Sequence, residues 1–184
     1  MKESNNEKKL QTTTLAGGCF WCIEGAFNSV KGIVSAKSGY MGGQSKEPSY
    51  KEVCTGQSGH AEVVQLEFDA DVTSYRDILE IFFTLHNPTQ LNRQGHDIGS
   101  QYRSEIFTHG QQQHDIAAAM IDEMTQAQLF DDAIVTRINP AEEFYCGEDY
   151  HQEYFKNNPE NQYCQAVVSP KLAKFRQTFV AKLK

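Results

Sequence analysis

Two kinds of hydrophobic pattern occur along the chain, and together they predict a domain that mixes strands and helices. Residues 60–69 alternate apolar and polar side chains, which is typical of a strand with one buried face. Residues 74–88 instead repeat apolar side chains at helical spacing, with Ser74 as a candidate N-cap and Pro88 after the end. Further strands are predicted over residues 12–18, 33–40, 101–109 and 132–138, and further helices over 22–32, 111–128 and 148–158. Because these elements interleave without a strict parallel rhythm, we expect an α+β fold, a two-layer sandwich of a mixed sheet with helices on one side.

Three stretches of the chain lack this periodicity or show it weakly. Residues 38–59 are glycine-rich and aperiodic, and residues 87–100 form a second irregular stretch. Loops of this length inside a compact domain are uncommon and usually functional. We expect a further irregular segment around Cys164, followed by an amphipathic surface helix over residues 170–184.

Length and charge narrow the possible classes of protein. The 184 residues suit one domain with a sizeable core, and we expect residues 1–10 to be a flexible lead-in to a single domain over 11–184. A net charge of −7 argues against nucleic acid as a partner, because phosphate binding needs a concentrated basic face. The chain lacks both an apolar run of roughly 18 residues and a secretory signal, so we expect a cytoplasmic protein without membrane contact.

The string GGCFWCI at residues 17–23 is the first candidate for chemistry. It contains two of the five cysteines, which are Cys19, Cys22, Cys54, Cys146 and Cys164. An odd number of cysteines without a signal peptide favours redox or metal use over a disulfide framework. A C-x-x-C pair also occurs in thioredoxin-like dithiol oxidoreductases and in zinc modules. A facing strand without proline counts against the first alternative, and the absence of a second cysteine pair counts against zinc, so we expect no metal.

Cys19 lies at a predicted strand-to-helix junction. Free amide N–H groups and the helix dipole at such a junction favour an anion, so we expect a lowered thiol pKa and a reactive Cys19. Glu62 shares strand parity with Val64 and Leu66, so it faces the apolar side of its strand or is solvated at the end of it. In an apolar setting the carboxyl pKa rises, and the group can serve as a general acid.

Five strings in a fixed order give the most specific signal in the sequence. They are GGCFWCIEGAF, SGYMGG, PSYKEVCTGQSGHAEVV, HNPTQLNRQGHDIGSQYRS and EDYHQEYFKNNP, which together span roughly residues 12–164. The chain thus resembles the methionine sulfoxide reductase A family. The resemblance implies a ferredoxin-like two-layer α+β fold and reduction of the S epimer of methionine sulfoxide, free or in proteins, to methionine.

The resemblance also implies a role for each residue of the site. It makes Cys19 the nucleophile and Glu62 the proton donor to the sulfoxide oxygen. It assigns the substrate-binding roles to Phe20 and Trp21 as an apolar wall, Tyr50 and Tyr102 as hydrogen-bonding partners, and Asp97 as an orienting group. The implied reaction leaves Cys19 as a sulfenic acid, and no resident cofactor is expected.

Regeneration of Cys19 needs a second thiol and an external reductant. The string ENQYCQ resembles family members in which one cysteine after a tyrosine resolves the sulfenic acid, so Cys164 is the first candidate. Cys22 and Cys146 stay open as rivals, as does a reaction without an internal resolving thiol, and the family pattern usually has glycine in place of Cys22. Cys54 matches a position where cysteine is common in the family but not needed. The expected reductant is thioredoxin, or dithiothreitol in vitro, and the expected protein is a monomer.

Overall fold

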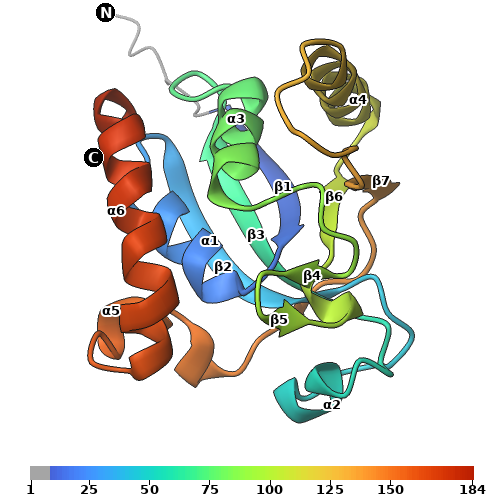
Figure 1. The fold of residues 1–184 in the computed structure, drawn as a ribbon, viewed down its shortest axis with the longest axis vertical. Coiled ribbons are helices and arrows are strands. Elements are labelled where there is room, and N and C mark those ends of the chain that lie inside the picture. Colours follow the sequence, from blue (N-terminus) through green and yellow to red (C-terminus); the bar gives the residue numbers. More distant parts are fainter. Residues whose placement is uncertain (1–8) are drawn as a thin grey trace, which may run out of the picture.

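The computed structural model describes residues 9–184, which form a six-stranded sheet with helices packed against one face (Figure 1). The strands are β1 (Leu10–Gly17), β2 (Ile33–Met41), β3 (Ala61–Asp69), β6 (Ser104–Thr108), β7 (Arg137–Pro140) and β8 (Tyr145–Cys146), and a separate pair is formed by β4 (Arg93–Gln94) and β5 (Asp97–Ile98). The helices are α1 (Phe20–Phe27), α2 (Tyr50–Cys54), α3 (Tyr75–Leu85), α4 (Gln111–Gln126), α5 (Tyr154–Asn157) and α6 (Ser169–Thr178). A flexible lead-in was expected over residues 1–10. Residues 1–8 of this stretch lie outside the described residues, and Leu10 is already the first residue of β1.

The strand order is β7-β6-β1-β3-β2-β8. Every pair in this sheet is antiparallel except β6 and β7, which run parallel. The sheet is therefore mixed and mostly antiparallel, and the predicted α+β class is confirmed.

Local sequence signals account for the central elements. Strand β3 pairs with both β1 and β2, and its alternating side chains place Val64, Leu66 and Phe68 in the main core. Helix α3 begins with a capping box in which the Ser74 hydroxyl accepts the Asp77 N–H and the Asp77 carboxylate accepts the Ser74 N–H. These two elements follow the sequence prediction closely.

The two faces of the sheet are covered differently. Side chains from α1, α3, α4 and α6 join one large buried cluster on the helical face. The other face carries a smaller cluster of Ala16, Met41, Ala61, Val63 and Phe107, against which Ala141 and Phe144 pack from the segment between β7 and β8. Helices thus cover one face, and a connecting segment covers the other.

The C-terminal part of the chain differs from the sequence prediction. The expected irregular segment around Cys164 is wrong, because residues 164–168 form a π-helical turn that leads directly into α6. Asn161 starts this helical run, since its side-chain oxygen accepts the Tyr163 N–H at 2.9 Å and the Cys164 N–H at 3.3 Å. A cap at Asn161 was not predicted.

Helix α6 is also more deeply packed than a surface helix. Leu172 and Phe175 are only 2 % and 1 % exposed and belong to the main core. A side chain at Gly25 of α1 would touch Leu172 at 3.2 Å, so the glycine allows the two helices to approach closely. Beyond α6, the Lys182 carbonyl accepts the Lys31 N–H at 2.8 Å, which fastens the C-terminal end to the turn after α1.

The predicted helix over 148–158 is divided into two parts. A short 3₁₀ turn covers Asp149–His151, and α5 begins at Tyr154. Glu153 between them has a φ of 53°, a left-handed conformation that interrupts the helical path. None of the helices in residues 9–184 is long and apolar enough to span a bilayer.

Candidate active site

The sharp turn from β1 into α1 places Cys19 at the start of the helix. Gly18 has a φ of 92°, which turns the chain, and a side chain there would meet Gln94 at 2.7 Å. Cys19 is the N-cap residue of α1 and is 8 % exposed. The predicted strand-to-helix junction is therefore present, with the Cys19 thiol at its helical end.

The pKa of the Cys19 thiol differs from the expectation. Burial raises this pKa well above its ordinary value, and a hydrogen bond with Cys22 and the charge of Glu62 raise it further. The Trp21 N–H lowers the pKa by a smaller amount. The predicted lowering of the Cys19 pKa is wrong for the resting protein, because loss of water outweighs the amide groups of the helix start.

Glu62 lies on β3 opposite Tyr40 and is 1 % exposed. One carboxyl oxygen, Oε1, accepts the backbone N–H of Phe20 at 3.4 Å, while Oε2 has no hydrogen-bond partner within residues 9–184. Burial raises the pKa of Glu62 to about 8, with a further increase from the charge of Asp97. Near neutral pH this carboxyl group is mostly protonated, directly beside the residue that follows Cys19.

Loops and short elements bring the two predicted tyrosines and the aspartate to the same place. Tyr50 begins α2, and Tyr102 ends a 3₁₀ turn that spans Ser100–Tyr102. Burial raises the pKa of both phenols, and the charge of Glu62 is the next largest cause for each. Asp97 on β5 accepts the Tyr163 hydroxyl at 2.6 Å. The long loops expected to be functional therefore do meet around Glu62.

Aromatic rings line the same site. The Phe20 ring lies 6.4 Å from the rings of both Trp21 and Tyr50, measured between centroids. The indole of Trp21 stacks on Tyr154 at 3.8 Å with an interplanar angle of 7°, and the edge of Tyr163 approaches it at 5.8 Å. Phe20 and Trp21 thus form an apolar surface next to Cys19 and Glu62.

All five cysteines are free thiols, and they differ in their surroundings. The hydrogen bond with Cys19 lowers the pKa of Cys22 despite its burial. Cys164 is fully buried, and the charge of Cys22 adds to the increase in its pKa that burial causes, which places these two thiols near each other. Cys54 and Cys146 are exposed, at the end of α2 and on the edge strand β8 respectively.

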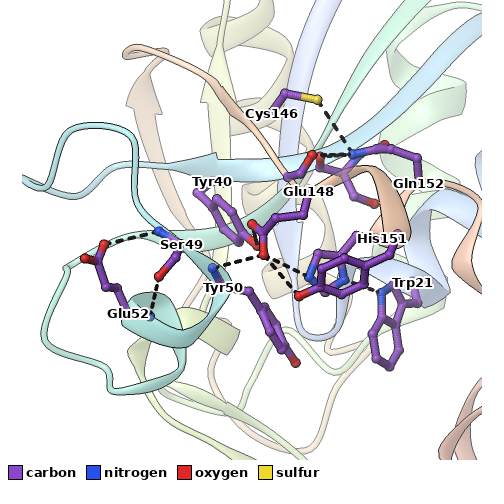
Figure 2. Close-up of polar contacts among 12 residues, drawn as sticks. Trp21, Tyr40, Ser49, Tyr50, Glu52, Cys146, Glu148, His151 and Gln152 are labelled. Atoms are coloured by element: carbon purple, nitrogen blue, oxygen red, sulfur yellow. Dashed lines mark hydrogen bonds and ion pairs between the residues drawn. The ribbon is translucent and has the colours of Figure 1, made fainter.

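Three polar residues of the site were not singled out from the sequence. His151 accepts the indole N–H of Trp21 at 3.1 Å, and Glu148 accepts the hydroxyl of Tyr40 at 3.1 Å (Figure 2). Glu24 accepts the backbone N–H of Glu153 at 3.0 Å, and burial raises the pKa of Glu24 to about 7. His151 and Glu148 lie in the string EDYHQEYFKNNP, but no local pattern links that string to Trp21.

No group of three or more histidine, cysteine, aspartate or glutamate side chains in residues 9–184 is arranged to hold a metal ion. The C-x-x-C pair therefore has no set of additional ligands around it in the described part of the chain. What the arrangement offers instead is a buried thiol, a neutral carboxyl group and phenolic hydroxyl groups beside an aromatic surface. Such a set can transfer a proton to a polar oxygen while the thiol reacts.

Comparison with known proteins identifies the family. The family model for peptide methionine sulfoxide reductase matches residues 11–183. A peptide methionine sulfoxide reductase MsrA from Polynucleobacter asymbioticus is 52 % identical over 174 residues, which cover 95 % of this chain and 92 % of the relative. Another MsrA, from Natronomonas pharaonis, is 51 % identical over 94 % of this chain and 97 % of the relative.

Solved structures agree with this assignment. Reduced Mxr1 from Saccharomyces cerevisiae is 35 % identical and superposes with a TM-score of 0.78 over 87 % of this chain and 91 % of its own. Methionine sulfoxide reductase A of Corynebacterium diphtheriae is 34 % identical and superposes with a TM-score of 0.73 over 83 % of this chain and 76 % of its own. The chain therefore belongs to the peptide methionine sulfoxide reductase family, MsrA, and is an oxidoreductase.

Proposed function

We propose that the protein reduces the S epimer of methionine sulfoxide, free or in proteins, by means of Cys19 and Glu62. The observation that carries this proposal is the buried Glu62 carboxyl group, whose Oε2 has no hydrogen-bond partner within residues 9–184. Its pKa of about 8 keeps it protonated near neutral pH, and its Oε1 is hydrogen-bonded to the residue after Cys19. A neutral acid beside a nucleophile is what sulfoxide reduction requires.

The chemistry follows from the poor leaving ability of the sulfoxide oxygen. Glu62 donates its proton to that oxygen while the sulfur of Cys19 attacks the substrate sulfur. The oxygen then passes, with the proton from Glu62, to the sulfur of Cys19 as the bond between the two sulfur atoms breaks. The proton that the Cys19 thiol gives up returns to Glu62, so that sulfoxide and thiol become methionine and Cys19 sulfenic acid. The hydroxyl groups of Tyr50 and Tyr102, which lie near Glu62, are suited to hold the oxygen without adding charge.

Three points of contact would select one epimer. The methyl group would lie on the aromatic surface of Phe20 and Trp21, the oxygen would face Glu62, and the sulfur would face Cys19. With the methyl group, the oxygen and the face of the sulfur that meets Cys19 fixed, the rest of the methionine chain can leave the site in only one direction. The S configuration is the one that the family resemblance implies.

Cys164 is the proposed resolving thiol. It condenses with the Cys19 sulfenic acid to form a disulfide and one molecule of water. The proposal is supported by the burial of both thiols in the same core cluster, on α1 and on the turn that leads into α6. Cys22 is the alternative, because it lies one helical turn from Cys19, hydrogen-bonds to it and has a lowered pKa.

Thioredoxin is the proposed reductant of this disulfide. Mxr1, which superposes on this chain with a TM-score of 0.55 at 26 % identity in that form, has been solved in complex with Trx2. Reduction by a dithiol restores both cysteines by thiol–disulfide exchange. A groove of about 1020 Å³ borders the site at Asp97 and Tyr163 and could receive the stretch of a protein chain next to an oxidised methionine.

We also propose the finer description of the fold that the resemblance implies. The order β1–α1–β2–β3–α3–β6 along the chain and the arrangement β6-β1-β3-β2 in the sheet support a ferredoxin-like core. One main core cluster, with members from β1 to the residue after α6, supports a single catalytic domain over residues 11–184. We expect this domain to work as a monomer without a resident cofactor.

Peptide mapping after one turnover tests the proposed function. The reduced protein is mixed with a single equivalent of S or R sulfoxide, quenched with an alkylating agent and digested. We expect methionine from the S epimer only, and a Cys19–Cys164 disulfide in place of two alkylated thiols. Consumption of neither epimer would contradict the proposal, and so would a Cys19 that is still recovered as an alkylated free thiol after turnover. A Cys19–Cys22 disulfide would keep the reaction but reassign the resolving thiol.

A further inference from the structure

His151 occupies the centre of the aromatic surface next to Cys19. Its side chain is completely buried. The centroid of its ring lies 5.0 Å from that of Phe20, 5.8 Å from that of Trp21 and 4.4 Å from that of Tyr50. His151 therefore contacts all three rings that we assign to the substrate site, although it comes from a different part of the chain.

The hydrogen bond between Trp21 and His151 fixes the tautomer of the histidine. An indole N–H is a donor only, so Nδ1 of His151 accepts it, at 3.1 Å. A neutral imidazole then carries its proton on Nε2. That atom faces Oε2 of Glu148 at 3.7 Å and has no closer polar partner within residues 9–184. The histidine thus lies between the indole donor on one side and the Glu148 carboxylate, just beyond hydrogen-bond distance, on the other.

Glu148 connects this histidine to two other elements of the site. Its Oε1 accepts the hydroxyl of Tyr40, from β2, and its Oε2 accepts the backbone N–H of Tyr50, at the start of α2 (Figure 2). Both bonds join residues that are about a hundred positions apart in the chain. Glu148 therefore sets the position of α2 relative to the turn that carries His151.

We propose that His151 and Glu148 are positioning residues for the substrate surface, in which His151 orients the indole of Trp21 and Glu148 holds His151 and Tyr50 in register. This role rests on the proposed function, because the surface of Phe20 and Trp21 is where the substrate methyl group would bind. An aromatic surface contacts the methyl group equally before and during the reaction. Loss of its orientation therefore raises KM and leaves kcat almost unchanged.

The fluorescence of Trp21 is a direct probe of its contact with His151, because Trp21 is the only tryptophan in the protein. Its fluorescence needs neither substrate nor turnover, so it tests the contact even if the proposed function were wrong. We compare His151→Asn with His151→Gln. Asparagine places its polar group where Nδ1 lies and can still accept the indole N–H, whereas glutamine places it where Nε2 lies. We expect His151→Asn to keep the emission maximum of the wild type and His151→Gln to shift it.

The same pair of variants gives the kinetic test. We expect His151→Gln to raise KM for S-methionine sulfoxide roughly tenfold, the factor that loss of one hydrogen bond corresponds to, with kcat within twofold. His151→Asn should recover most of this loss. Equal effects of the two variants on emission and KM, or a loss confined to kcat, would overturn the proposal. Because both variants carry the same amide group, they decide the question even if an apolar replacement such as His151→Leu prevents folding.

Glu148→Gln tests the second half of the proposal. The amide can still accept one hydrogen bond but carries no charge, so we expect a smaller increase in KM, about threefold, and a shifted emission maximum. Glu143→Gln is the matched control, because Glu143 accepts the exposed hydroxyl of Tyr145 at 3.0 Å outside the aromatic surface. We expect the control to match the wild type. A Glu148→Gln protein indistinguishable from this control would exclude Glu148 as a positioning residue.

Discussion

Burial keeps the Glu62 carboxyl group protonated near neutral pH and also lowers the stability of the fold at high pH. The unfolded chain releases this proton near the ordinary pKa of 4.5, whereas the folded protein keeps it up to about pH 8. Between these values the folded state binds more protons than the unfolded state, so the stability contributed by this group falls as pH rises.

We therefore expect Glu62→Gln to gain stability relative to the wild type as pH rises from 4.5 to about 8. The difference of about 3.5 pKa units (8 − 4.5) corresponds to on the order of 3–5 kcal/mol in the free energy of unfolding. Urea unfolding of both proteins at a series of pH values measures it. At neutral pH the same variant should reduce sulfoxide at least about 100-fold more slowly, because an amide cannot give up a proton.

Glu67→Gln is the control for both measurements, since Glu67 lies on the same strand with the opposite parity. We expect its stability difference from the wild type to stay constant over this pH range, and its rate to be normal. A Glu62→Gln protein that behaves like Glu67→Gln would remove Glu62 from the mechanism.

The start of helix α1 brings two titratable groups close together, and neither is ionised in the resting protein. At neutral pH Glu62 and Cys19 both keep their protons in the resting protein, because burial raises the pKa of each. The amide groups of the helix start do not overcome this burial. We therefore expect Cys19 to oxidise slowly in the resting protein, since the thiolate is the reactive form.

Cysteine variants test the proposed disulfide between Cys19, at the start of α1, and Cys164, on the turn that leads into α6. We expect Cys164→Ser to complete one turnover with dithiothreitol but to lose thioredoxin-driven cycling by at least about tenfold, because the sulfenic acid then has no resolving partner. Rates of NADPH consumption in a thioredoxin-coupled assay measure this loss. The exposed Cys146 gives the control, and Cys146→Ser should cycle normally.

Two results would contradict this assignment. Normal thioredoxin-linked cycling by Cys164→Ser would exclude Cys164 as the resolving thiol. If Cys22→Ser loses cycling instead, the partner of Cys19 lies within α1 itself, one helical turn away.

Elements with local signals could be predicted from the sequence, and those that depend on distant contacts could not. The alternation in β3 and the capping box of α3 are short-range patterns, so both were found. The side-chain contact between Trp21 and His151 joins positions 130 apart and leaves no periodic trace. The lowered pKa expected for Cys19 failed for the same reason, because its burial depends on elements far away in the chain.

At the scale of the whole molecule, α6 packs beside α1 (Figure 1). Leu172 and Phe175 are almost completely buried against the core, so this helix is part of the domain rather than an attachment to it. The stripe of Leu172, Phe175 and Phe179 predicted an amphipathic helix at the surface. The apolar stripe nevertheless faces inward, as the spacing of Leu172 and Phe175 required.

We expect Leu172→Ala to lower the free energy of unfolding by about 2–4 kcal/mol, since it leaves a cavity between α6 and α1. Thermal or urea unfolding measures the change. Val180→Ala is the control, because Val180 is 68 % exposed and should change stability by less than about 0.5 kcal/mol. A Leu172→Ala protein as stable as this control would show that α6 does not contribute to the core.

Residues 163–184 are anchored at both ends, and this limits how Cys164 can move. Tyr163 is bound to Asp97 at the beginning of the segment, and the backbone of Lys182 is bound to Lys31 near its end. A segment held in this way cannot swing open like a hinged lid without breaking one of the two anchors. If Cys164 forms the proposed disulfide with Cys19, the segment itself must therefore absorb the change in shape. Its π-helical turn is the natural place, because such a turn becomes α-helical by a shift of one residue in its hydrogen bonds.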